Sequence, residues 1–347
     1  MYKEIEETES FCIELISNAQ AETGEFKTFL FFPEKKENGW IYSGPSVFLT
    51  SCIGISLLNL PQDHCKKIVL KAASFVKSQM NEYGLWRFYP HHGLFKFNTP
   101  LDIDDTSLAS YLLSKCNISF PDNKKYLLKQ IDNYGNFKIW FFPRLRYLTY
   151  PKLWWSLLTD FLNYYPILFP LKGRTTKPLV SFNDFEHAVS ANALLYLGKN
   201  SSTQKSINHL IEDTLFGNTQ NYFFYPGEIF TLYHYSRLYS VGIQDFENVK
   251  SKVENYVLKL DFNQQDFFHK LIILLTCLNF KILLEFVEKK FKILFENYEN
   301  ELKSHYGYFC TKDRMMLGGS NVYVASVFLE LIHLYKLNFL TPHDAVS

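Results

Sequence analysis

Three carboxylates within four residues are the most reactive feature of the sequence. They are Asp102, Asp104 and Asp105, in the run Pro100-Leu101-Asp102-Ile103-Asp104-Asp105-Thr106. If these side chains face an apolar cavity, their like charges and the loss of water both disfavour ionisation, so that one of them stays protonated near neutral pH. The run therefore predicts a general acid that delivers a proton to a substrate.

Two other interpretations fit the same carboxylates. The run is also typical of a helix start, with Asp102 as the N-cap and the next two carboxylates complementing the helix dipole. A Mg²⁺ site is the third interpretation, because hard cations also gather carboxylates. The aspartate-rich metal motif D-D-x-x-D is not satisfied, however, since Asp104-Asp105-Thr106-Ser107-Leu108 ends in leucine.

Helices must position these carboxylates, because apolar residues recur mostly at helical spacing. Ile68, Val69, Ala72, Phe75 and Val76 follow one face of a helix. Proline and glycine cluster between such segments and do not recur every 8–12 residues, as they do in sandwiches or barrels of strands. The sequence therefore predicts a mainly α-helical protein.

A glycine followed closely by a large aromatic residue recurs after the predicted helices. The copies are Gly39-Trp40, Gly84-Leu85-Trp86, Gly135-Asn136-Phe137, Gly307-Tyr308-Phe309 and a weaker one at 217–222. Two of them share the longer pattern Q-x-x-x-Y-G-x-aromatic, at 79–86 and 130–137. A period of about 45–50 residues with two helices indicates an α/α array. About six pairs fit in 347 residues, either as an open solenoid or as a closed (α/α)6 toroid.

Composition excludes several classes of protein. Lys and Arg number 36 against 35 Asp and Glu, so the net charge of +1 gives no field to hold nucleic acid. The six cysteines form no C-x-x-C pair, as expected for reduced thiols in a cytosolic protein. The acidic N-terminus lacks the features of a signal peptide, and polar residues interrupt the apolar stretches. We therefore predict a cytoplasmic protein. Its composition is unusual mainly in its high content of aromatic residues, which is 18%.

One stretch, at about 141–175, exceeds the repeat length. It combines many aromatic and aliphatic residues with flanking Arg144, Arg146, Lys152, Lys172 and Arg174. An aromatic and basic amphipathic insert of this kind is expected to lie on a bilayer as a peripheral contact or to line an opening to the barrel. Ordinary helix packing is the alternative.

The carboxylate run and the repeats together resemble one superfamily. Asp102-Ile103-Asp104-Asp105 resembles the D-x-D-D motif of class II terpene cyclases, which include squalene–hopene cyclases, and the Gln…Gly-x-aromatic repeats resemble their QW motifs. The segment 183–193 is also similar to one in bacterial single-barrel relatives. The resemblance implies an all-α fold, an (α/α)6 toroid that forms a single domain over 1–347. Because related cyclases use two barrels, the cavity is either built within one toroid or completed by a partner domain or a second copy.

The resemblance also implies roles for the carboxylates. Asp104 matches the acid that protonates a double bond of a linear isoprenoid, such as farnesyl or geranylgeranyl diphosphate, to start its cyclisation. Asp102 and Asp105 match the carboxylates that orient it. Protonation requires no cofactor, and Mg²⁺ would assist only with a diphosphate substrate.

A carbocation needs a dry pocket lined by aromatic rings, which stabilise positive charge by about 0.5–2 kcal/mol each. The candidate rings are Trp86, Phe88, Tyr89, Phe97, Trp140, Tyr225, Tyr233 and Tyr308, although Trp86 is expected to be structural, as the QW tryptophan usually is. Candidates for ending the reaction are His187, Asn192 and His234, which interrupt apolar helices. Candidates for binding a diphosphate are Arg237, Lys312 and Arg314.

Two alternatives to a cyclase remain at this point. In the first, the barrel is a non-catalytic scaffold that binds an isoprenoid or a partner, and the aspartates only cap a helix. In the second, the barrel is a zinc-dependent α/α toroid, because Asp63-His64-Cys65 supplies the Asp-x-Cys grouping that protein prenyltransferases use.

Overall fold

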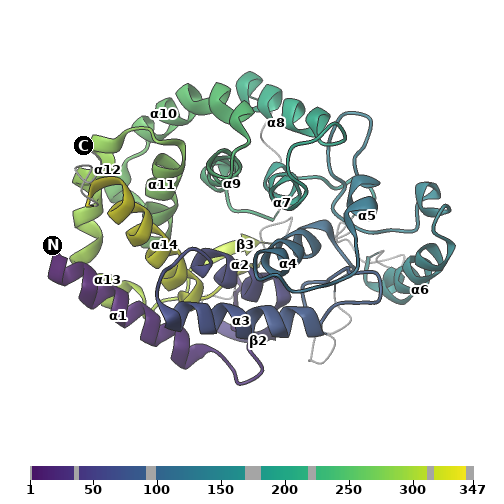
Figure 1. The fold of residues 1–347 in the computed structure, drawn as a ribbon, viewed down its shortest axis with the longest axis horizontal. Helices are drawn as coiled ribbons and strands as arrows, with labels where there is room; N and C mark the ends of the chain where they lie inside the picture. The colour runs from purple at the N-terminus through teal and green to yellow at the C-terminus, as the bar shows by residue number, and fades with distance from the viewer. Residues whose placement is uncertain are drawn as a thin grey trace.

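A ring of six inner helices forms the centre of the computed structural model, which describes residues 2–34, 39–90, 99–168, 181–217, 224–310 and 316–340. The inner helices are α2 (Val47–Leu57), α4 (Ile103–Lys115), α7 (His187–Leu197), α9 (Glu228–Ser240), α11 (Phe267–Phe280) and α14 (Asn321–Phe339). Each packs on the next in this order, and α14 packs on α2, so the ring closes (Figure 1). The predicted (α/α)6 toroid is confirmed, in its closed form.

Outer helices cover this ring and precede their inner partners in the chain. They are α1 (Tyr2–Ala19), α3 (Asp63–Ser78), α5 (Lys124–Leu128), α8 (Gln204–Phe216), α10 (Lys250–Lys259) and α12 (Leu284–Phe291). The sequence distinguishes the two layers. The outer helix α3 buries only one stripe of side chains, whereas every residue of the inner helix α2 is buried. Helices that are apolar all round belong in the interior, and amphipathic ones belong at the surface.

Short helical elements complete the connections. They are η2 (Leu145–Tyr147), η3 (Gln244–Val249), η4 (Phe262–Gln264), η5 (Lys292–Phe295) and α13 (Tyr298–Glu301).

A four-stranded antiparallel sheet, which the sequence did not predict, reaches the end of the ring where the inner helices begin (Figure 1). Its strands are β1 (Lys27–Phe31), β2 (Trp40–Pro45), β3 (Gly307–Cys310) and β4 (Leu317–Gly319), in the order β2-β1-β4-β3. The sheet joins residues near the two ends of the chain, so its pairing has no local signal. The glycine–aromatic pattern at Gly39-Trp40 follows strand β1 and leads into β2. Our prediction that this copy of the pattern follows a helix was wrong.

The two longer copies of the repeat form the same turn. In the first copy the Asn81 side chain accepts the backbone N–H group four residues ahead at 2.9 Å, and Asp132 does so at 3.0 Å in the second. Gly84 and Gly135 follow with φ of +72° and +108°, a region that glycine adopts without strain. An added Cβ would also meet a neighbouring backbone oxygen at 2.9 and 3.0 Å. The sequence repeat is therefore a structural repeat.

An extended segment follows each of these turns and crosses the end of the ring where inner helices begin. Phe88 accepts a hydrogen bond from the N–H of Val47 at 2.9 Å, and Leu101 accepts one from Phe141 at 3.0 Å. The first aromatic residue after each glycine is buried in the core, and the residues two and three positions after it reach the mouth of the barrel.

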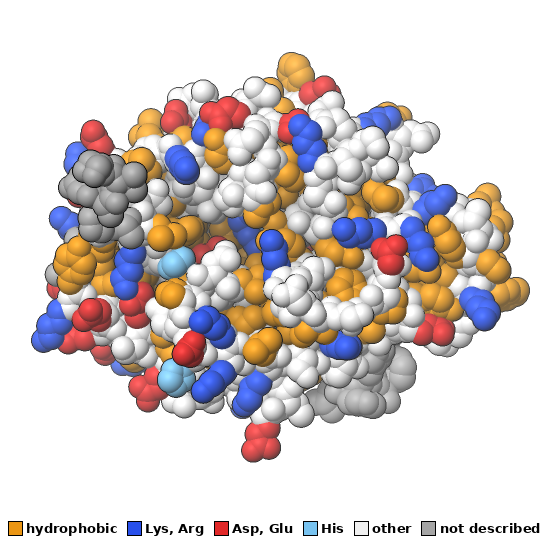
Figure 2. Space-filling view, viewed as in Figure 1, with side chains coloured by type: hydrophobic (Ala, Val, Ile, Leu, Met, Phe, Trp, Pro, Cys, Tyr) orange, Lys and Arg blue, Asp and Glu red, His pale blue; other side chains and the backbone are white. Residues whose placement is uncertain are grey.

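The predicted insert contains helix α6 (Pro151–Leu168), which lies outside the ring at the edge of the molecule (Figure 1). Its outer side exposes Trp155 and Leu162, and Leu145 and Leu148 just before it are also exposed. In Figure 2, hydrophobic side chains are exposed at this edge and lie among Lys and Arg side chains. Contact of this insert with a bilayer stays a prediction.

One described helix, α14, is long and apolar enough to cross a membrane. It is an inner helix that packs between α11 and α2, and 61% of its most apolar stretch is buried in the barrel. Its composition is accounted for by this central position.

Candidate active site

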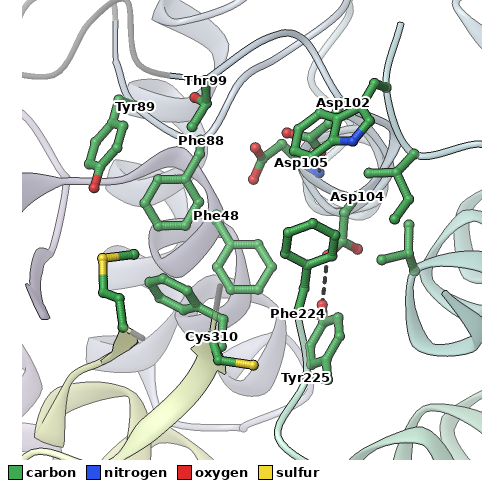
Figure 3. A pocket seen from close by; sticks show the side chains of 15 residues that line it. Phe48, Phe88, Tyr89, Thr99, Asp102, Asp104, Asp105, Phe224, Tyr225 and Cys310 are labelled. Atoms are coloured by element: carbon green, nitrogen blue, oxygen red, sulfur yellow. Dashed lines mark hydrogen bonds between the residues drawn. The ribbon is translucent and has the colours of Figure 1, made fainter. Parts of the chain in front are cut away.

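A pocket of about 160 Å³ opens at the end of the ring where the inner helices begin. Carboxylates and aromatic rings form its wall. In Figure 3 the three aspartates lie across the pocket from Phe88 and Tyr89, and Phe224 and Tyr225 lie on the same side as Asp104. The lining residues are Phe48, Phe88, Tyr89, Thr99, Asp102, Asp104, Asp105, Ile139, Trp140, Val189, Phe224, Tyr225, Phe309, Cys310 and Met316. Apart from the three aspartates, this wall is almost entirely apolar.

The start of α4 brings the three aspartates to the pocket. Asp102 is the N-cap, and its side chain accepts the backbone N–H of Asp105 at 2.8 Å. Asp104 and Asp105 occupy the first turn, where they are 8% and 2% exposed. The helix-cap interpretation therefore applies to Asp102, whereas the side chain of Asp104 is directed to other elements of the ring.

Two hydrogen-bond donors from other parts of the ring hold the Asp104 carboxylate. The Asn192 amide of α7 donates to Oδ1 at 2.8 Å, and the Tyr225 hydroxyl, just before α9, donates to Oδ2 at 2.7 Å (Figure 3 shows the tyrosine bond). Asn192 also donates to the Tyr225 hydroxyl at 3.0 Å. The three side chains come from positions up to 121 residues apart and form one closed unit.

Burial makes all three aspartates weaker acids than usual. It raises the pKa of Asp104 to about 7, an effect that the charge of Asp102 increases and the hydrogen bonds from Tyr225 and Asn192 oppose. Burial likewise raises the pKa of Asp102 to about 6. The pKa of Asp105 lies well above its usual range because of burial and the adjacent Asp102, with which its carboxyl group shares a hydrogen bond. The cluster thus retains protons at neutral pH.

The raised pKa of Asp104 predicts a pH-dependent stability. Its native pKa of about 7 lies above the unfolded value, so the native state binds an extra proton at intermediate pH, and stability falls as pH rises towards 7. Above that pH the loss of stability caused by the ionised, buried Asp104 is constant. Between pH 5 and pH 8 we expect the free energy of unfolding of Asp104→Asn to rise by about 3 kcal/mol relative to wild type, since each pKa unit is worth about 1.4 kcal/mol. Urea unfolding at both pH values measures this difference.

The matched control is Asp245→Asn. The hydrogen bond from Lys199 lowers the pKa of the Asp245 carboxylate. The stabilising effect of this ion pair is therefore lost only when the pH falls below the ordinary pKa of an aspartate. Its difference from wild type should be the same at pH 5 and pH 8. An Asp104→Asn difference that is equally flat would contradict the protonated state assigned to this cluster.

Four of the predicted rings line the pocket: Phe88, Tyr89, Trp140 and Tyr225. The Trp140 indole N–H donates to Asp184 at 3.1 Å, which fixes the ring. Asn192, one of the candidates for ending the reaction, does not line the pocket but donates a hydrogen bond to Asp104 from behind the lining residues.

Three further predicted rings do not line the pocket. Trp86 is fully buried and donates to the carbonyl of Val76 at 2.7 Å, in the structural role expected for it. Tyr308 lies behind the wall, with its ring 5.5 Å from that of Tyr225. Tyr233 lies further along α9, where its hydroxyl reaches Glu330 on α14. The helical periodicity could not show which side of the core each of these rings would face.

Two predicted polar residues also lie away from the pocket. His187 directs Nε2 to Asp213 of the outer helix α8 at 3.1 Å, because the first position of α7 faces outward. Burial keeps the pKa of His187 below its usual value. Arg237 lies about three turns into α9, with its guanidinium 5.7 Å from the ring of Tyr233. Phe97, Lys312 and Arg314 lie outside the described residues.

His234, also considered as a base, is buried behind Tyr225, with ring centres 4.7 Å apart. Its Nδ1 faces the carbonyl of Phe230 at 2.6 Å and its Nε2 faces the hydroxyl of Tyr308 at 3.3 Å. Burial lowers its pKa to about 3, so this imidazole is neutral.

Several lining residues were not predicted from the sequence, among them Phe48, Phe224 and Phe309. A positional signal exists for Phe48, which is the second residue of α2 after the N-cap Ser46, just as Asp104 is the second residue of α4. Phe309 lies two positions after the glycine of its repeat. Phe224 has no such signal, because its place depends on contacts with α7 and β3.

The described residues contain no group of three or more His, Cys, Asp or Glu side chains arranged to hold a metal ion. Asp63 of the Asp-x-Cys grouping pairs with Lys66 at the surface, at 3.0 Å, and Cys65 is buried. In the pocket, both oxygens of Asp104 are occupied by hydrogen-bond donors. The donor sets therefore do not fit the zinc or the Mg²⁺ interpretation.

Comparison with known proteins relies on structure, because no family model matches the sequence and the search of curated proteins finds no similar sequence. A variant of the type II terpene cyclase MstE from Scytonema, in complex with the product merosterolic acid A, has a TM-score of 0.66 at 11% identity, covering 96% of this chain and 97% of the other. The two chains share the α/α-barrel fold.

A second MstE variant, in complex with the substrate geranylgeranyl dihydroxybenzoate, has a TM-score of 0.64 at 13% identity and covers 96% and 99% of the two chains. A protein from Actinoplanes has a TM-score of 0.65 at 10% identity and covers 94% and 99%. The shared α/α-barrel fold therefore extends over nearly the whole chain.

Proposed function

We propose that the protein is a protonation-initiated terpene cyclase, which converts a linear isoprenoid to a cyclic product. The observation that carries this proposal is the protonated carboxyl cluster at an aromatic, apolar pocket. The shared fold adds support, because MstE has been captured with a geranylgeranyl substrate. A fold alone does not define an activity, so the chemistry of the pocket is the stronger argument.

In the proposed reaction, Asp104 is the general acid. Its pKa of about 7 leaves it partly protonated at neutral pH, whereas the carboxyl proton of Asp105 is shared with Asp102. The Asp104 proton passes to one carbon of a terminal double bond, whose π electrons form the new C–H bond. A tertiary cation remains on the other carbon. A second double bond attacks it to close a ring, and loss of a proton or addition of water ends the sequence.

The hydrogen bonds to Asp104 favour this step because they strengthen as negative charge develops. Once the proton has left, the hydroxyl of Tyr225 and the amide of Asn192 each donate to one oxygen of the new carboxylate. Hydrogen bonds to charged groups are stronger than those to neutral ones. The pair thus stabilises the conjugate base and makes a buried carboxyl group a stronger acid than burial alone would allow.

The opposite wall suits the cation. Phe48, Phe88 and Phe309 form a group of rings with centre-to-centre distances of 4.9–5.7 Å. Their faces attract positive charge without reacting with it, and each contact is worth up to about 2 kcal/mol when water is excluded. We assign these three rings to stabilising the cation.

For the substrate, we propose an isoprenoid of 15 or 20 carbons, either as farnesyl or geranylgeranyl diphosphate or with another polar head group. The wall described here is apolar away from the aspartates, so it contacts the hydrocarbon chain. With a diphosphate, Lys312 and Arg314 are the proposed cationic partners, because Arg237 is buried beside Tyr233, away from the pocket. Mg²⁺ enters the proposal only as a counter-ion of that diphosphate.

Incubation with substrates tests the function. We expect the purified protein to convert farnesyl diphosphate, geranylgeranyl diphosphate or geranylgeranyl dihydroxybenzoate to a cyclic product, detected by mass spectrometry after extraction. In D₂O the product should gain one deuterium at the protonated carbon, which separates protonation from ionisation of a diphosphate. Binding of these compounds without any turnover would instead support the non-catalytic scaffold.

A further inference from the structure

A fully buried glutamate connects the two elements that hold Asp104. Glu186 is the N-cap of α7 and is 0% exposed. Its Oε2 accepts the backbone N–H of Phe224 at 2.8 Å, and its Oε1 accepts that of Tyr225 at 3.0 Å. One carboxylate thus binds two consecutive N–H groups of the segment before α9. Hydrogen bonds of this kind, from neutral donors to a buried carboxylate, are among the stronger ones in proteins.

Both partners of Asp104 depend on this connection. Asn192 lies on α7, the helix that Glu186 begins, and Tyr225 belongs to the segment that Glu186 binds. The carbonyl of Phe224 accepts the N–H of Cys310 in β3 at 2.8 Å, which holds the same segment from its other side. The tyrosine hydroxyl therefore reaches Asp104 from a backbone that is fixed on two sides.

We propose that Glu186 is a positioning residue for the proton donor, holding the Tyr225 hydroxyl against Asp104. The proposal deepens the cyclase function, on which it rests. Two acceptor oxygens are needed at this place, because two N–H groups point to it. Glutamine has the same shape but only one acceptor, and its NH₂ group would face one of the N–H groups. Glu186→Gln should therefore loosen the segment without changing the volume of the site.

The sign of the effect follows from the groups that face Asp104. Burial and the charge of Asp102 raise its pKa, whereas the Tyr225 hydroxyl, the Asn192 amide and the charge of Arg237 on α9 lower it. Cys52 of α2 also lies close, with a thiol that burial keeps neutral. Loss of the tyrosine bond removes one of the effects that lower the pKa. The pKa of Asp104 should therefore rise, and its acid strength should fall.

The test combines Glu186→Gln with Tyr225→Phe. Infrared difference titration follows the carboxyl group of Asp104, identified by its absence in Asp104→Asn. We expect each single variant to raise the pKa of Asp104 by about one unit, the value of one hydrogen bond to a charged group. We expect the double variant to show no further rise, because Glu186 acts through Tyr225. Cyclisation should fall about tenfold in each single variant.

Additive pKa shifts in the double variant, or an unchanged pKa in Glu186→Gln, would overturn the proposal. The matched control is Asp266→Asn at the N-cap of α11, which should lose stability without moving the titration. If Glu186→Gln does not fold, Glu186→Asp replaces it, since aspartate keeps the charge but is one methylene shorter. The titration needs no substrate, so a protein without cyclase activity can still show the predicted shift. Failure of the function and failure of the positioning role are thus distinguishable.

Discussion

Asp104→Asn is expected to lower the rate of cyclisation by at least about 1,000-fold while the barrel stays folded. Asparagine has nearly the shape of aspartate and keeps a polar contact with Tyr225, but it has no carboxyl proton to give. General acids contribute roughly 10²–10⁴-fold to the reactions they assist, and an unactivated double bond must gain a proton to become a cation. Product formation under single-turnover conditions measures the loss.

The control for this experiment is Asp245→Asn, the same chemical change at a carboxylate that pairs with Lys199 far from the pocket. It should leave the rate within twofold of wild type. Asp105→Asn provides a second comparison, because Asp105 is assigned to orienting the acid together with Asp102. A fully active Asp104→Asn variant beside an inactive Asp105→Asn variant would transfer the acid role to Asp105. Full activity in both would refute the proposed chemistry of the cluster.

Trp86→Ala is expected to destabilise the protein by about 4 kcal/mol, within the range for deletion of a large buried aromatic side chain. Trp86 is fully buried, its indole N–H donates to the carbonyl of Val76, and its ring lies 6.1 Å edge-on from that of Phe120. The variant loses the apolar contact and leaves a buried carbonyl without this donor. Urea unfolding measures the change in the free energy of unfolding.

Trp155→Ala is the matched control, because this tryptophan of α6 is 63% exposed. The Trp155→Ala substitution should change the free energy of unfolding by no more than about 0.5 kcal/mol, as other surface substitutions do. Equal costs for the two variants would mean that the first aromatic residue after the glycine turn does not join the helical layers. Trp86→Ala should also weaken the site indirectly, because the carbonyl of Trp86 accepts the N–H of Asp102 at 3.2 Å.

Local patterns in the sequence predicted the parts of this site that depend on neighbouring residues. The aspartate run predicted both the start of α4 and the acid cluster, because capping and charge repulsion act within one helical turn. The Q-x-x-x-Y-G-x-aromatic repeat predicted the two equivalent turns at Gly84 and Gly135. Closure of the ring followed from the resemblance to the cyclase family, since periodicity alone allows an open array equally well.

Contacts between distant segments could not be predicted in the same way. The sheet pairs β1 with β4, which are separated by almost the whole chain. His187 and Asn192 both interrupt the apolar pattern of α7, yet one faces the outer layer and the other faces Asp104. A difference of five residues turns a helix by well over a full turn, and the sequence does not show where the barrel axis lies. Glu186 is inconspicuous for a similar reason, since its partners are backbone groups.

The closed ring has a consequence for the ends of the chain. Helix α1 packs against α14, and Glu9 pairs with Lys336 at 2.6 Å, so the first and last helices meet as closely as covalently linked neighbours do (Figure 1). The barrel is therefore sealed at this seam by side-chain contacts between α1 and α14 and by the pairing of β1 with β4. A chain with the same closed ring of helical pairs could begin at any of several other points around the ring. The acid cluster lies in the second helical pair after this seam and is shielded by its neighbours from fraying of the terminal helices.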